Sequence, residues 1–102
     1  MKAKRTITPG EGIPIKFSTA ERTLVLEHTL ADPELTDRLR SAVPKRGVCV
    51  VFYTIDDLDE LLGYVAAEAT HATDKKIQRA LDRLFERLQG ELNSYDDGLW
   101  PK

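Results

Sequence analysis

Val48-Cys49-Val50-Val51-Phe52-Tyr53 is the clearest strand in this chain. Its residues are mostly β-branched or aromatic, the types that pack best on a pleated surface. The segment is apolar on both faces, which is typical of a strand that is covered on both sides. We therefore expect residues 48–53 to form the central strand of a small sheet.

Two amphipathic helices are predicted after this strand. Thr54 and Asp57 fit a capping box, in which a hydroxyl residue and an acid three positions later accept hydrogen bonds from each other's backbone N–H groups. One helix should run to about residue 71 or 72, and Thr73-Asp74 should cap the next, within or at the end of which Gly90 lies. The two helices are expected to form an antiparallel hairpin. Their apolar positions recur at helical spacing: Ile55, Leu58, Leu62, Val65, Ala66 and Ala69, then Ile77, Ala80, Leu81, Leu84, Leu88 and Leu92.

Residues 19–30, before the strand, have two interpretations. Ser18 and Glu21 fit another capping box and predict a helix over this range. The alternative is a strand, because apolar residues alternate in the second half of the range and several of its residues are β-branched. A further helix is predicted over about 33–43, with Asp32 as its cap and a proline after its end.

The N-terminal segment also has two interpretations. Residues 4–8 and 13–17 alternate apolar and polar side chains on both sides of Pro9-Gly10-Glu11-Gly12, which predicts a hairpin. The alternative is an ordered N-terminal arm without a hairpin. Pro14 has no N–H to donate, so its strand must lie at a sheet edge or direct this position away from the neighbouring strand.

Segments 13–21 and 48–56 match each other at an offset of 35 positions (54 − 19 = 35). Each contains an alternating strand, a hydroxyl residue and an acidic first helical turn. The match indicates an internal duplication or, alternatively, the common pattern of a strand that enters a capped helix. In both cases the two strands can pair with their helices packed on one side.

Together these elements predict an α+β fold, with a two- or three-stranded sheet packed by about four helices. A chain of 102 residues is long enough for one domain and too short for two. Hydrophobic residues make up 41% of the chain, enough to build a core. We expect a single domain over residues 1–95 and a polar C-terminal tail over residues 96–102, in which Trp100 can dock.

The composition argues against a chain whose main task is to grip nucleic acid or an anionic membrane. Fifteen Lys and Arg residues against seventeen Asp and Glu residues give a net charge of -2. The single cysteine cannot form an intramolecular disulfide, and residues 1–10 lack the apolar segment of a secretory signal. The longest apolar run, residues 48–53, is too short to span a bilayer. We therefore expect a cytoplasmic protein with no membrane partner.

Charge is segregated along the two C-terminal helices. A basic stripe at helical spacing lies on the last helix and consists of Lys76, Arg79, Arg83 and Arg87. An acidic cluster opens the preceding helix and consists of Asp56, Asp57, Asp59 and Glu60. The two groups can pair within the fold or between two copies of the chain, and the basic stripe can alternatively bind phosphate groups.

A polar stripe of Glu60, Tyr64, Glu68 and His71 is the candidate for chemistry. Glu68 and His71 are one helical turn apart, the spacing at which helix-borne metal sites place two ligands. A convex helix face lacks the partly desolvated pocket that acid–base catalysis needs, so catalysis would require a second wall from His28 or from another chain. A solvent-exposed polar face explains the stripe without a metal.

The favoured hypothesis is a non-catalytic module that self-associates as a homodimer or binds another protein. Small sheets leave strand edges and apolar helix faces that a partner can cover. Cys49 lies in an apolar strand, where a thiol behaves as a small buried hydrophobe. We expect no catalytic residue, no metal and no cofactor. The alternatives are a nucleic-acid accessory protein that uses the basic stripe and a metal-dependent enzyme with a site at Glu68 and His71.

Overall fold

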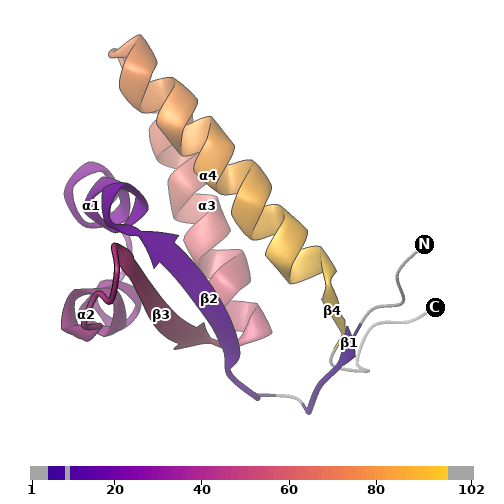
Figure 1. Ribbon diagram of the computed structural model, residues 1–102. Coiled ribbons are helices and arrows are strands. Elements are labelled where there is room, and N and C mark those ends of the chain that lie inside the picture. Colours follow the sequence, from indigo (N-terminus) through magenta and orange to yellow (C-terminus); the bar gives the residue numbers. More distant parts are fainter. Residues whose placement is uncertain (1–4, 9, 97–102) are drawn as a thin grey trace.

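A computed structural model describes residues 5–8 and 10–96 of the chain. The α+β class, the small sheet and the helical hairpin at the end of the chain are confirmed (Figure 1). In chain order the elements are β1 (Arg5–Thr6), β2 (Ile13–Ser18), α1 (Thr19–His28), α2 (Pro33–Ser41), β3 (Val48–Tyr53), α3 (Ile55–His71), α4 (Lys75–Asn93) and β4 (Tyr95–Asp96).

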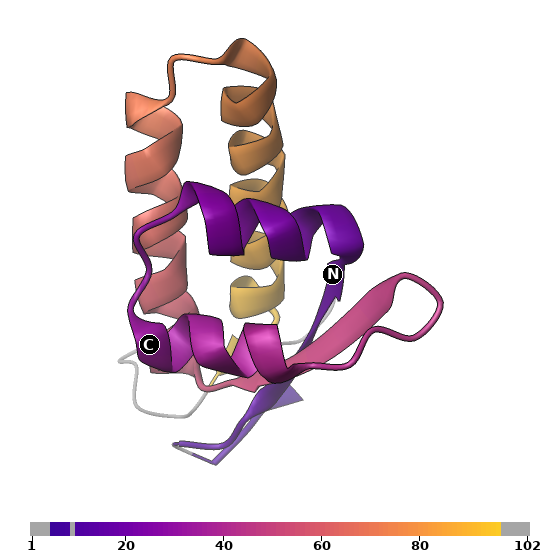
Figure 2. The ribbon, with the colours of Figure 1, turned by 90° about the vertical axis from the view of Figure 1, so that its left-hand side faces the viewer.

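β2 and β3 form a two-stranded antiparallel sheet that runs from the pair Ile13–Tyr53 to the pair Ser18–Val48. The four helices lie on one side of this sheet, and α1 and α2 run across the axes of α3 and α4 (Figure 2). The core therefore fills the space between one sheet face and the helices. The inward side chains of the two strands are all buried: Ile13, Ile15, Phe17, Cys49, Val51 and Tyr53.

Each helix begins at the cap that the sequence predicts. Ser18 forms a complete capping box with Glu21, and Thr54 forms one with Asp57. The aspartates before α2 and α4 accept hydrogen bonds from the first backbone N–H groups of those helices. Residues 19–28 are therefore helix rather than strand, because the cap starts the helix and its apolar side buries Leu24 and Val25 in the core. α4 continues through the exposed Gly90.

The predicted N-terminal hairpin is wrong. β2 pairs with β3, and β1 pairs in parallel with β4, with Arg5 opposite Tyr95 and Thr6 opposite Asp96. β2 pairs with β3 over six residues, and in this register the buried faces of both strands match. Pairing with β1 would involve only two residues and is therefore less favourable. Asp96 of the predicted tail thus belongs to β4, whereas residues 97–102, including Trp100, lie outside the described residues.

β3 is not a central strand, because among the described residues it has one strand neighbour and not two. α2 lies along its other side, where Arg38 donates to the carbonyl of Phe52 at 3.4 Å. The helices cover the sheet on one face alone, so the apolar residues on the second face of β3 remain at the surface. Cys49 points inward and is buried, as predicted.

The junction of β2 with α1 is fastened by an arginine from α4. Arg87 donates to both carboxylate oxygens of Glu21, at 2.7 and 2.9 Å, and to the carbonyl of Lys16 at 2.7 Å. Its guanidinium carbon lies 5.8 Å from the centre of the Phe17 ring. One cation thus ties the last helix to the strand, to its final aromatic residue and to the acid of the capping box.

The junction of β3 with α3 has the same construction. Arg38 of α2 donates to Asp57 at 2.6 Å and to the carbonyl of Phe52, and its guanidinium carbon lies 5.6 Å from the centre of the Tyr53 ring. Tyr53 also donates its hydroxyl to Leu35 O at 2.6 Å. Burial raises the pKa of Tyr53 well above its usual value, so this hydroxyl remains a donor.

Corresponding residues of the two junctions are 36 positions apart, since the capping residues are Ser18 and Thr54 (54 − 18 = 36). The predicted offset of 35 is wrong as a structural correspondence. It would match the buried Ile13 with the exposed Val48, whereas an offset of 36 matches the buried Ile13, Ile15 and Phe17 with the buried Cys49, Val51 and Tyr53.

Candidate functional site

The side chains that point away from the core form an apolar surface on the sheet. We call this surface the outer sheet face, and it consists of Pro14, Lys16, Val48, Val50 and Phe52. The exposed fractions are 39% for Val48, 44% for Val50 and 61% for Phe52. Because a strand with one solvated face normally carries polar residues there, this row of three apolar side chains on β3 is unusual.

β2 supports Phe52 in its exposed position. Pro14 lies directly opposite Phe52 in the sheet. Gly12, just before β2, is so near that a Cβ at this position would lie 3.1 Å from Cβ of Phe52. The absence of a side chain at Gly12 therefore gives Phe52 room to lie beside the turn that leads into β2.

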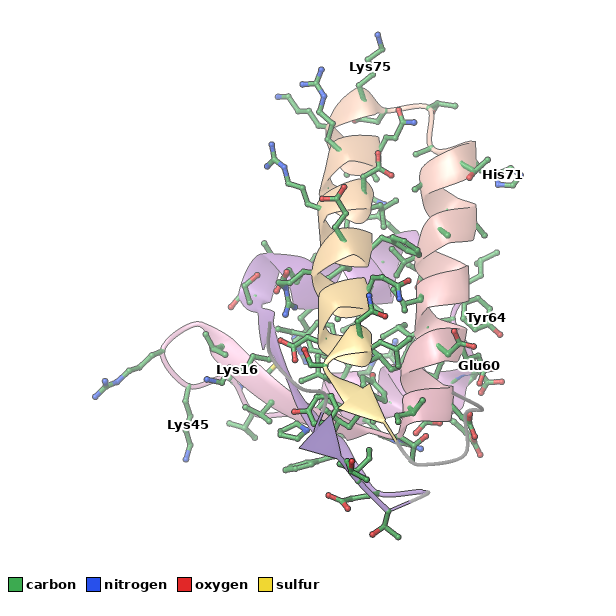
Figure 3. The ribbon with its side chains drawn as sticks, turned by 90° about the vertical axis from the view of Figure 1, so that its right-hand side faces the viewer. Lys16, Lys45, Glu60, Tyr64, His71 and Lys75 are labelled. Carbon is green, nitrogen blue, oxygen red and sulfur yellow. The ribbon has the colours of Figure 1, made fainter. Side chains whose placement is uncertain are left out.

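Basic side chains border the apolar row. Lys16 lies opposite Val50 on the outer sheet face, and the exposed Lys45 and Arg46 lie in the turn before β3. Figure 3 shows Lys16 and Lys45 near each other on the same side of the molecule. Arg46 and Gly47 both have a positive φ, 54° and 78°, which gives the turn its tight path. The outer sheet face is therefore positive from its middle to the turn before β3, although the whole chain has a net charge of -2.

The free edge of β3 is partly occupied. Val48 accepts from Lys45 N at 2.8 Å and donates to Lys45 O at 3.1 Å. Arg38 donates to Phe52 O. Val50 is thus the one residue on this edge whose outward backbone groups bond no described residue. The exposed strand edge that the sequence predicts as a site of self-association is therefore shortened on β3 to the two groups of Val50 and the N–H of Phe52.

The free edge of β2 is interrupted in a similar way. Thr19 N donates to Gly47 O and continues the ladder, so the even-numbered residues of β2 direct their backbone groups away from β3. Pro14 has no N–H on this edge, which confirms the predicted orientation of that position. Lys16 O accepts from Arg87, and Ser18 N donates to Glu21. A partner strand would find isolated groups on this edge and no continuous row.

The predicted basic stripe is divided by the fold. Arg87 is held by Glu21 and by a strand carbonyl, as described above, and serves the β2–α1 junction. Lys76, Arg79 and Arg83 are exposed on α4, and no acidic side chain of residues 5–8 and 10–96 forms an ion pair with them. They remain candidates for binding phosphate groups.

The predicted acidic cluster is divided as well. Partial burial acts to raise the pKa of Asp57, but hydrogen bonds from Arg38 and from Thr54 outweigh it and lower the pKa below its usual value. Asp56, Asp59 and Glu60 are exposed at the start of α3. The start of α3 lies at the opposite end of the hairpin from the start of α4 (Figure 3), so these acids do not pair with the exposed cations of α4 within the fold.

Glu68 and His71 line a pocket of about 410 Å³ between the end of α1, the end of α3 and the start of α4. His28 of α1 lines the same pocket, so both histidines of the chain meet there and His28 supplies a second wall. Tyr64 is not among the lining residues and packs, half-buried, against the core. Figure 3 shows Glu60, Tyr64 and His71 along the side of α3 that is turned away from α4.

This pocket does not gather a set of metal ligands. Within the described ranges, 5–8 and 10–96, no three His, Cys, Asp or Glu side chains are placed so that they could hold a metal ion. His71 Nδ1 is bonded to Ala67 O at 2.8 Å, and Asp74, which also lines the pocket, uses its Oδ1 to cap α4. Part of the polar lining is therefore already used by the ends of the helices.

The outer sheet face is absent from the sites that the sequence predicts. Its signal was the apolar composition of β3 on both faces, which predicts two covered faces. The structure covers one of them. The second face can be recognised as a candidate site only when the number of strands and the sheet face that the helices cover are known. Both are properties of the tertiary structure.

Comparison with protein-family models, with curated proteins and with solved structures finds no match to this chain. No helix of the described part of the chain is both long and apolar enough to cross a bilayer. The argument for a function therefore has to rest on the surfaces themselves.

Proposed function

We propose that this protein is a non-catalytic module that binds another protein through the outer sheet face. The observation that carries the proposal is the exposed apolar row of Val48, Val50 and Phe52 on β3. A contiguous apolar patch that includes an aromatic residue is typical of a protein interface. Covering the exposed part of Phe52 would contribute up to about 2 kcal/mol to such a complex.

The arrangement of the polar residues supports the non-catalytic part of the proposal. Acid–base catalysis uses groups that converge in a partly desolvated pocket. Tyr64 lies outside the pocket that Glu68 and His71 line, and both histidines are exposed. The strongest features of the surface are thus apolar and electrostatic, the features that bind a partner.

A second copy of the chain is one partner that the proposal allows, and the homodimer stays a prediction from the sequence. A complex of two copies and a complex with a different protein can be distinguished by the mass of the cross-linked product. A cross-link between two copies would have twice the mass of the chain.

The test places a photo-crosslinking amino acid at position 52 of the full-length chain in the cells that encode it. We expect a discrete adduct with one protein, because position 52 would lie inside the interface. The matched control places the same amino acid at position 30, since Leu30 is also apolar and is 83% exposed on the loop between α1 and α2. Val50→Lys should abolish the adduct at position 52, and Thr23→Lys on the exposed side of α1 should leave it.

Three results would contradict the proposal. They are the absence of an adduct at position 52, the same adduct from position 30, and an adduct that survives Val50→Lys. Circular dichroism and a thermal melt of each variant would show that the fold is intact, as expected for substitutions at exposed positions.

A further inference from the structure

We infer that the partner segment on the outer sheet face is an acidic amphipathic helix of another protein, and not an added β-strand. This inference rests on the proposed function and names the chemistry of the partner. It follows from the state of the strand edges, from the length of the apolar row and from the charge around it.

The strand edges argue against an added strand. Strand addition requires a row of free N–H and C=O groups along one edge. On β3, Lys45 uses both outward groups of Val48, and Arg38 uses the carbonyl of Phe52. On β2, Pro14 lacks an N–H and Arg87 occupies the carbonyl of Lys16. On β3 an added strand would therefore find a free row of only the two groups of Val50 and the N–H of Phe52, whereas the whole face is accessible to a partner.

The apolar row has dimensions that suit a short helix. Val48, Val50 and Phe52 lie at alternate positions over five residues of strand, and the four steps between them span about 13 Å. A helix covers this length in about nine residues, or between two and three turns. The inner face of the same sheet is already covered by helices, so a helix on the outer face would complete a layered arrangement of helix, sheet and helix.

The charges of the outer sheet face favour an acidic partner. Lys16 lies on the face, and Lys45 and Arg46 lie at its end. Glu11, in the turn that leads to the other end of the sheet, accepts from Thr8 N. Complementary charge across an interface steers the partner and selects against like-charged competitors. The partner helix should therefore carry Asp or Glu beside its apolar side.

A second copy of the chain fits this surface poorly. Lys16 lies near the middle of the outer sheet face, so a two-fold stack of two such faces would bring the Lys16 side chains of both copies together. The exposed acids of α3, Asp56 and Glu60, have the right charge. The exposed residues that follow them on the same helix are Gly63 and Ala67, which are too small to anchor on the sheet. Another protein is therefore a better occupant than α3 of a second copy.

The test titrates isotope-labelled full-length protein with synthetic peptides of about 18 residues and follows the backbone amides by NMR. The first peptide is a helix with Leu and Phe on one side and Glu on its flanks, and the second carries Lys in place of Glu. The third has the composition of the first in a strand-like alternating order. We expect the first peptide to shift amides of β2 and β3 and to bind at least about tenfold more tightly than the other two.

Substitutions in the protein sharpen the test. Phe52→Ser should weaken binding of the acidic peptide by about tenfold or more, and Leu30→Ser should leave it unchanged. Lys16→Glu combined with Lys45→Glu should reverse the preference between the acidic and the basic peptide, because the charge of the face is then reversed. Thermal melts would check that all variants are folded.

The outcomes separate this inference from the proposed function. If position 52 cross-links to a protein but the basic or strand-like peptide binds as well as the acidic helix, the inference is overturned and the proposed function stands. Preferential binding to phosphatidylserine vesicles, or self-association that Phe52→Ser abolishes, would also overturn it. If position 52 cross-links to nothing and no peptide shifts the amides of β2 and β3, both fail.

Discussion

The two strands differ in the outward residue that precedes their inward aromatic side chain. On β2, Lys16 precedes Phe17, and on β3 the corresponding residue before Tyr53 is Phe52 (52 − 16 = 36). The inward residues of the two junctions are of the same kind, with Phe17 at one and Tyr53 at the other, and these two rings contact each other edge to face with centroids 6.3 Å apart. Both inward positions must fill one core. The outward positions are free of this demand, and on β3 they are apolar without any need of the fold.

The two arginines also differ in how firmly they hold their junctions. Arg87 makes two hydrogen bonds to Glu21 and a short one to the carbonyl of Lys16. These partners precede Arg87 by 66 and 71 positions in the sequence. Arg38 makes one bond to Asp57 and a longer one to a strand carbonyl. The β2–α1 junction is thus tied to the last helix, and the β3–α3 junction to its neighbour α2.

The largest effect is expected for Phe17→Ala, which should destabilise the protein by about 3–5 kcal/mol. Phe17 is fully buried, so its removal leaves a cavity beside Tyr53. Urea unfolding followed by circular dichroism would measure the change. If this variant does not fold, Phe17→Leu gives a milder step of about 1 kcal/mol. A loss below 0.5 kcal/mol for both would show that the core does not depend on this ring.

Removal of the two arginines should give intermediate and unequal effects. Arg87→Met is expected to cost about 1–2 kcal/mol, because Glu21 loses two charge-assisted hydrogen bonds. Arg38→Met should cost about 0.5–1 kcal/mol, since Arg38 is more exposed and makes one bond to its acid. Urea unfolding of both variants tests the order, and equal losses would contradict the difference between the junctions.

Asp57→Asn should lower the free energy of unfolding by about 1 kcal/mol at neutral pH. The dependence of this loss on pH tests whether it comes from the charge of the Asp57 carboxylate. The folded protein holds the pKa of Asp57 below its usual value, so the ionised carboxylate stabilises the fold above about pH 4. This contribution is lost as the pH falls through the lowered pKa. The difference in unfolding free energy between the wild type and the variant should therefore be constant above about pH 5 and shrink in more acidic solution. A difference that grows on acidification would refute the assignment.

The smallest effect on stability is expected for Phe52→Thr, within about 0.5 kcal/mol of the wild type. Phe52 is 61% exposed and threonine is a good strand residue. The same change should remove binding of the partner protein identified by cross-linking, measured by calorimetry. Together with Phe17→Ala, this variant separates the residue that the fold requires from the residue that we assign to binding.

Several parts of the fold could be predicted because their signals are local. The hydroxyl and acid of each capping box lie three positions apart, so Ser18 with Glu21 and Thr54 with Asp57 identify the helix starts without any knowledge of the rest of the molecule. The strand at 48–53 and the apolar sides of α3 and α4 are visible for the same reason. The candidate site was not predicted in this way, since Val50 and Val51 look alike in sequence and differ in the face they occupy.

The order of residues was enough to establish the caps, the amphipathic helices and the strand of β3, because these depend on neighbours within about one helical turn. The partner of β2, the roles of Arg38 and Arg87, and the exposure of Phe52 depend on segments that are distant in sequence. These features arise when the chain selects one packing among several that satisfy the local signals. The outer sheet face exists because two strands and four helices close the core on one side and leave apolar residues of β3 on the other.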